Sequence, residues 1–222
     1  MKYAACAFVV LVTAGGWATY ALFAWLYSMR NFRFDSLEKI VAGGSTIGAI
    51  VGVVAGICYW WALSQWHLGT GSWVPATALG WTVGGALGSA VSSAMYTTLI
   101  SEPLTSDIYG IGLGVTALVV GAVIGAVTSI CQWLVMRARI RRAWRWIVIT
   151  TAASAIAGFT AWLTGLIVGA SIASVTGWAG WAVFVPVGLV TGVIAGGVVV
   201  GVATVFSLWL MVGSRWTRPE QA

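Results

Sequence analysis

One glycine-rich segment that ends in tryptophan is written three times along this chain. Residues 48–63 read GAIVGVVAGICYWWAL, residues 121–136 read GAVIGAVTSICQWLVM, and residues 197–212 read GVVVGVATVFSLWLMV. The first two copies align without a gap at an offset of 73 residues, from Gly48 to Gly121, and the third follows the second at an offset of 76. A repeat at such a spacing predicts that one structural unit is built several times.

The composition requires this repeated material to lie in lipid. Hydrophobic residues make up 60% of the chain and charged residues 7%, whereas soluble domains carry about 25% charged residues. Backbone groups in lipid must be hydrogen-bonded internally, which favours helices, and about 20 apolar residues span the hydrocarbon core. We therefore expect an all-α integral membrane protein with a single transmembrane domain over residues 1–222. Six apolar runs are predicted to form transmembrane helices: roughly 4–28, 40–64, 73–99, 111–136, 146–170 and 182–212.

The repeat extends to the helices between the glycine-rich segments. Trp73 and Trp146 are separated by the same offset as the first two copies, and so are Gly85 and Gly158. The unit is therefore predicted to be a two-helix hairpin, present three times in tandem and in one orientation. This predicts pseudo-threefold symmetry along the membrane normal, rather than the inverted repeat of many transporters. The units cover approximately residues 1–64, 73–136 and 146–212.

Basic residues are distributed unevenly between the two sides of this predicted bundle. With six helices the two termini share a side, and most of the eleven basic residues lie there too. Because basic loops stay in the cytoplasm, a multi-pass protein with both termini cytoplasmic is expected. The basic residues on that side are Lys2, Arg137, Arg139, Arg141, Arg142, Arg145, Arg215 and Arg218. The other side holds Arg30, Arg33 and Lys39, together with Asp35, Glu38, Glu102 and Asp107.

Glycines recur at every fourth position within several of the runs, which places them on one helix face. Small residues at this spacing let two membrane helices approach closely, so the glycine faces predict tight helix packing. A pore or a cofactor that needs backbone proximity is the alternative. The glycines predicted to mediate packing are Gly44, Gly48, Gly52, Gly56, Gly121, Gly125, Gly197 and Gly201.

Most tryptophans are expected to lie at the membrane–water interfaces, where indole rings prefer the headgroup level. Trp17 and Trp81 are predicted to lie deeper, and they are the candidates for stacking on a bound lipid or pigment. His67, in the turn QWHLGTGS, is either an interfacial polar residue or an axial ligand to a pigment. The sequence requires no cofactor, although a pigment or a lipid is compatible with it.

Two further polar features carry alternative interpretations. The basic turn RARIRRAWR, residues 137–145, holds its loop in the cytoplasm, and it could also bind anionic lipid or an acidic partner. Its candidate contact residues are Arg137, Arg139, Arg141, Arg142 and Arg145. A polar row on the repeated helices predicts either hydrogen bonds between helices or a polar path for a small neutral solute. The row comprises Thr128, Ser129, Gln132, Thr204 and Ser207.

The predicted lipid-buried segments contain no charged residue and no histidine. Proton relays and ion paths in membranes use such residues, and intramembrane hydrolysis needs an acid–base pair or a nucleophile with its base. We therefore expect neither an enzyme nor a metal site. The three cysteines, Cys6, Cys58 and Cys131, lie in apolar runs. Binding to nucleic acid would need a soluble basic face, and none is predicted.

The segment GAVIGAVTSICQWLVMR, followed by a basic turn and AWRW, resembles a motif of uncharacterised polytopic membrane proteins of bacteria, especially cyanobacteria and filamentous phototrophs. Hairpins in that group end in a QWLVLR-like sequence and restart at a tryptophan. The match is sharp around residues 121–146, partial at 48–73 and weaker at 197–216. The resemblance implies a bacterial inner membrane protein built from hairpin repeats, and it implies no activity.

The sequence leaves three functions open. The first is a non-catalytic accessory or structural subunit of a larger membrane complex, such as a photosynthetic or respiratory one, with membrane lipids and other transmembrane subunits as partners. The second is a channel or facilitator for a small neutral solute along the predicted threefold axis. The third is a pigment- or quinone-binding membrane protein.

Overall fold

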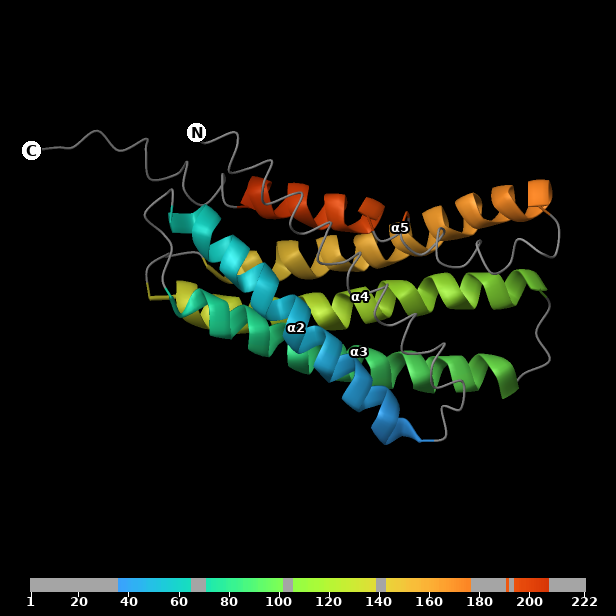
Figure 1. The fold of residues 1–222 in the computed structure, drawn as a ribbon, viewed down its shortest axis with the longest axis horizontal. Helices are drawn as coiled ribbons and strands as arrows, with labels where there is room; N and C mark the ends of the chain where they lie inside the picture. The colour runs from blue at the N-terminus through green and yellow to red at the C-terminus, as the bar shows by residue number, and fades with distance from the viewer. Residues whose placement is uncertain are drawn as a thin grey trace, which may run out of the picture.

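The computed structural model of the protein describes residues 36–64, 71–101, 106–138, 143–176, 191 and 194–207 (Figure 1). These residues are helical apart from short turns, and they include no strand. The helices are α2 (Leu37–Ser64), α3 (Trp73–Ser101), α4 (Ser106–Met136), α5 (Trp144–Thr176) and a C-terminal helical segment, Ile194–Ser207.

The helix ends follow from local sequence. Ser36 precedes α2 as a residue type that favours the N-cap, and Glu38 places negative charge in the first turn of the helix. Pro75 lies in the first turn of α3, where its missing N–H leaves no intrahelical bond unmade. The end of α4 is extended by a bond from Arg137 N to Trp133 O of 2.8 Å. The residue types at the helix ends therefore account for where α2 and α3 begin.

Three of the described helices are long and apolar enough to cross a membrane. They are Leu37–Trp61, Gly110–Met136 and Trp144–Val168, so the chain is a helical membrane protein. The helix α3 has the length but not the hydropathy, because glycine, serine and threonine replace larger apolar residues along it.

The described helices follow the predicted runs. The helices α2 to α5 cover the second to fifth runs, each extended by a few residues, and the C-terminal segment covers part of the sixth. The first run, 4–28, lies outside the described residues.

Consecutive helices run in opposite directions and pack against each other, with α3 between α2 and α4, and α5 beside α4 (Figure 1). The end of α2 and the start of α3 therefore lie at the same end of the bundle as the end of α4 and the start of α5. The C-terminal segment lies against α5, where Gly196 faces Ala157 and Ala161.

Glycines bring α2 into backbone contact with α3. A side chain at Gly48 would collide with the carbonyl group of Trp81, and one at Gly52 would lie 2.7 Å from the Trp81 Cβ. Gly44 and Gly56 likewise face α3, where Ser89 and Val74 lie. Because backbone atoms occupy the space that a Cβ would need, only glycine permits this approach.

The same contacts recur one repeat later, between α4 and α5. Gly121 faces the Ser154 carbonyl group as Gly48 faces that of Trp81, and the two pairs are related by the offset of the sequence repeat. A Cβ at Gly125 would lie 2.5 Å from the Ser154 Cβ, which matches the position of Gly52. Gly197 and Gly201 are buried in the C-terminal segment. The α2–α3 and α4–α5 interfaces are therefore built from equivalent glycine contacts.

The buried faces combine small and hydroxylated residues with some large apolar ones, whereas many other large aliphatic side chains, such as Ile50, Ile111 and Ile156, are exposed. Lipid solvates leucine and isoleucine as well as another helix does, so association depends on close packing and interhelical hydrogen bonds. The interior is therefore polar in places, and one such place is a cavity.

Candidate functional site

A cavity of about 30 Å³ lies among α2, α3, α4, α5 and the C-terminal segment. About 10–15 Å³ of such space holds one water molecule. From Ile124 to Gln132 the lining extends about 12 Å along α4 at 1.5 Å per residue. The residues that line the cavity are Tyr59, Trp81, Ile124, Gly125, Thr128, Gln132, Trp146, Thr150, Ser154, Val200 and Thr204.

Apolar clusters lie at both ends of the cavity. The first combines Tyr59 and Trp146 of the lining with neighbours nearer the basic turn; its members are Ala55, Tyr59, Leu63, Trp73, Met136, Ala143 and Trp146. The second extends in the other direction along the helices and comprises Ile47, Val51, Trp81 and Ile124. The hydroxyl and amide groups of the lining are therefore bracketed by apolar layers.

Gln132 links three helices across this site. Its Nε2 donates to Thr77 Oγ1 of α3 at 3.2 Å, and its Oε1 accepts a bond of 2.9 Å from Trp146 Nε1 of α5. An indole N–H can only donate, so this partner fixes the orientation of the Gln132 amide. An amide nitrogen carries two hydrogens, and the bond to Thr77 uses one of them.

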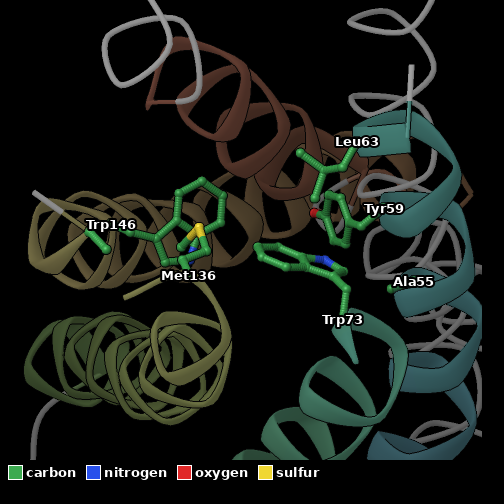
Figure 2. Packing of buried hydrophobic residues seen from close by; sticks show 7 residues of the cluster. Ala55, Tyr59, Leu63, Trp73, Met136 and Trp146 are labelled. Atoms are coloured by element: carbon green, nitrogen blue, oxygen red, sulfur yellow. The ribbon is translucent and has the colours of Figure 1, made fainter. Parts of the chain in front are cut away.

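Trp73 and Trp146 meet inside the bundle. Their ring centroids lie 6.1 Å apart with an interplanar angle of 71°, an edge-to-face contact. Figure 2 shows Trp73 directed towards Met136 and Trp146, with Tyr59 close by. The sequence predicts an interfacial position for both, as for most tryptophans, and in the structure their side chains are buried between helices at the ends of α3 and α5. Trp60, Trp61 and Trp144 of the same end are exposed.

Thr128 is a polar side chain of the lining whose buried hydroxyl has no partner among the described residues. The residue is 6% exposed, and its Oγ1 is buried without a hydrogen bond among the described residues. Other helical hydroxyls donate to a carbonyl of the preceding turn, as Thr82 does to Ala78 O at 2.7 Å. Thr128 instead packs its Cα, Cβ and methyl group against Gly80. The Trp73 Nε1 and Thr151 Oγ1 atoms are also buried without a partner among these residues.

Positions related by the sequence repeat converge on this cavity. Tyr59 and Gln132 are one such pair, and Trp81 and Ser154 are another; all four line the cavity. Further sets of equivalent positions are buried together: Val51, Ile124 and Val200; Ala55, Thr128 and Thr204; Thr77 and Thr150; Leu63 and Met136. The cavity therefore lies where the repeated elements face one another.

Of the three residues predicted to contact a bound pigment or lipid, one lies among the described residues. Trp81 is buried, at 7% exposure, and lines the cavity. Trp17 and His67, the other two candidates, lie outside the described residues. Among the residues the structure describes, no group of three His, Cys, Asp or Glu side chains comes together as a metal site would require.

The basic turn is described at its two ends. Arg137 and Arg145 are exposed, and the Arg137 guanidinium lies 5.4 Å from the centroid of the Trp133 ring. Such a contact contributes about 0.5–1 kcal/mol at an exposed site. Arg139, Arg141 and Arg142 lie outside the described residues.

Sequence inspection recognised Thr128, Gln132 and Thr204 as polar positions but did not connect them with Tyr59, Thr77 and Trp146. The signal that could have done so is the register of the repeat, since Tyr59 is the counterpart of Gln132. No family model, curated protein or solved structure matches this chain. The resemblance at residues 121–146 stays a prediction.

Proposed function

We propose that the chain forms six transmembrane helices, arranged as three hairpins around a pseudo-threefold axis. Two observations support this architecture. The glycine contacts of Gly48 and Gly121 are equivalent under the repeat, and so are the buried positions around the cavity. The first hairpin would contribute α2, the second α3 and α4, and the third α5 and the C-terminal segment.

The proposed topology places both termini and the basic turn in the cytoplasm of a bacterial inner membrane. It predicts opposite labelling of two exposed positions, Arg145 and Glu38, at opposite ends of the bundle. In a background with Cys6, Cys58 and Cys131 replaced by alanine, Glu38→Cys should react with an impermeant maleimide added to spheroplasts. Arg145→Cys should react only after permeabilisation. Reaction of Arg145→Cys from outside would invert the topology.

We propose further that the protein is a non-catalytic facilitator for a small neutral solute, which crosses along the axis. The observation that carries this proposal is the uncharged cavity lined by repeat-equivalent residues, whose apolar lining also includes hydroxyl and amide groups. Its hydroxyl and amide groups can replace hydrogen bonds that a neutral solute makes with water. Removing an ion from water costs on the order of several kcal/mol. The uncharged lining offers no counter-charge to offset this cost.

The cavity volume narrows the choice among the three functions. About 30 Å³ suits a solute of very few atoms and disfavours a pigment or quinone. Close packing surfaces on the glycine faces are used between helices of this chain, as at Gly48, Gly84 and Gly121, instead of being left for other subunits. Both observations favour the facilitator.

Flux through proteoliposomes tests the facilitator. Vesicles that contain the protein should pass water or another small neutral solute several-fold faster than protein-free vesicles of the same lipid. A pH gradient should leave the rate unchanged, because the cavity lining carries no charged side chain. Thr204→Leu, which adds apolar volume to the cavity lining, should reduce the flux while the protein stays monodisperse. Saturable uptake driven by the pH gradient would contradict the proposal.

The accessory subunit is the second candidate, and one observation favours it. The apolar window of α5 is only 22% buried, with Phe159, Leu163, Leu166 and Ile167 exposed. This face suits lipid or the helix of another subunit. A stoichiometric membrane partner that copurifies after mild detergent extraction, together with vesicles that show no flux, would place the accessory subunit ahead.

A further inference from the structure

The arrangement around Thr128 points to a specific ligand. The hydroxyl of Thr128 is buried, has no partner among the described residues, and belongs to a side chain that lines the cavity. Leaving a buried hydroxyl unbonded is unfavourable. Other part-buried threonines of the bundle, Thr82 and Thr116, avoid this by donating to a carbonyl group of their own helix. Thr128 makes no such bond among the described residues, and a small ligand in the cavity that its side chain lines can satisfy it.

The cavity can supply the other partners that such a ligand needs. Gln132 has a second amide hydrogen beyond the one bonded to Thr77, and Thr150, Ser154 and Thr204 add hydroxyl groups to the lining. A buried water molecule makes about three hydrogen bonds and requires about 10–15 Å³ of space. The cavity provides about 30 Å³. The ligand must accept, because the amide hydrogen only donates, and a ligand that also donates can bond to the hydroxyl groups in either direction.

We propose that the axial cavity binds water, held by the Thr128 hydroxyl and the Gln132 amide between the two apolar clusters. The role of this water in transport rests on the proposed function, with water as the solute that crosses through the cavity. The two apolar clusters flank the bound water along the helices. Gln132 is itself held by Thr77 and Trp146, so its amide is oriented before water binds.

The sign of a stability change tests the bound water. Thr128→Val keeps the shape of the side chain and removes the hydroxyl. If water is bound, Thr128→Val should lower the melting temperature of the full-length protein in micelles. Thr128→Ser, which keeps the hydroxyl, should melt close to the unmodified protein. If the cavity is dry, Thr128→Val removes an unbonded polar group, and the melting temperature stays the same or rises. That result would overturn the proposal. Thr116→Val, at a buried threonine bonded within its helix, is the matched control.

Radiolytic footprinting of the unmodified protein gives a second test that needs no variant. Hydroxyl radicals formed from bound water oxidise the aromatic side chains beside it, even where bulk solvent is excluded. Trp81 and Trp146 line the cavity and are buried, whereas Trp73 is equally buried outside the lining. We expect oxidation of Trp81 and Trp146 to exceed that of Trp73. Equal protection of all three would overturn the proposal.

These measurements are independent of transport, so the two proposals fail separately. If Trp81 and Trp146 are oxidised and Thr128→Val lowers the melting temperature, but vesicles show no flux, the water site is retained and the facilitator is removed. Flux of another neutral solute with neither signature would retain the facilitator and remove the water site. Water flux that falls in Thr128→Val vesicles, together with both signatures, is the expected result.

Discussion

Replacing Gly48 with leucine should lower the melting temperature of the bundle by roughly 10 °C. The glycine lies against the carbonyl group of Trp81, and backbone atoms cannot move aside as a flexible side chain can. Overpacking costs about 1–3 kcal/mol in well-packed cores, and this contact should reach the upper end. For chains of this length ~1 kcal/mol corresponds to about 2–4 °C. Thermal unfolding in a mild detergent is the measurement.

Two further glycines make this prediction specific. Gly121 makes the equivalent contact with Ser154, so Gly121→Leu should have an effect of similar size. Gly110 also lies in α4, but a Cβ at this position would have no other atom within 4 Å. Gly110→Leu is therefore the control and should leave the melting temperature nearly unchanged. If all three variants melted like the original protein, the glycine face of α2 would point to lipid.

Replacing Gln132 with leucine should have the second large effect, about 2 kcal/mol of lost stability. The substitution leaves the indole N–H of Trp146 buried without an acceptor and removes the donor to Thr77. Hydrogen bonds between membrane helices contribute only about 0.6 kcal/mol on average. The larger value applies here because an unpaired donor in a buried site costs about 1–3 kcal/mol. Equilibrium unfolding in mixed micelles measures the loss.

A double-mutant cycle separates the hydrogen bond from packing. Trp146→Phe removes the indole donor, and the double variant Gln132→Leu/Trp146→Phe should lose about 1 kcal/mol less than the two single losses together. Trp144, exposed at the start of α5, supplies the control substitution Trp144→Phe. Additive losses for Gln132 and Trp146 would show that their bond contributes nothing to stability.

The sequence predicted α2 to α5 well because the length and hydropathy of an apolar run depend on the local sequence alone. The runs that contain Gly48 and Gly121 form helices close to their predicted bounds. Spacing also placed the glycines of each run on one face. What spacing cannot give is the partner of that face, because Trp81 and Ser154 are chosen by how α3 and α5 are rotated. That rotation is set by the packing of whole helices.

The candidate site was harder to predict for the same reason. Gln132 stood out as an amide in an apolar helix, but its bond to Trp146 depends on whether that indole points inward or to the headgroups. A tryptophan near a helix end satisfies either environment, and composition favours the interface. The cavity itself is a small mismatch between packed side chains, such as Thr128 and Thr204, and no local pattern in a sequence encodes its volume.

One interface used twice has a consequence for how the chain assembles. The contact of Gly48 with Trp81 joins α2 to α3, and that of Gly121 with Ser154 joins α4 to α5. Each joins consecutive proposed hairpins head to tail, so a hairpin carries both complementary surfaces, and such contacts close into rings at a fixed rotation. The loops between hairpins then act as tethers. They raise the effective concentration of each hairpin near the next, to about the millimolar range for short linkers, and fix the order and number of units.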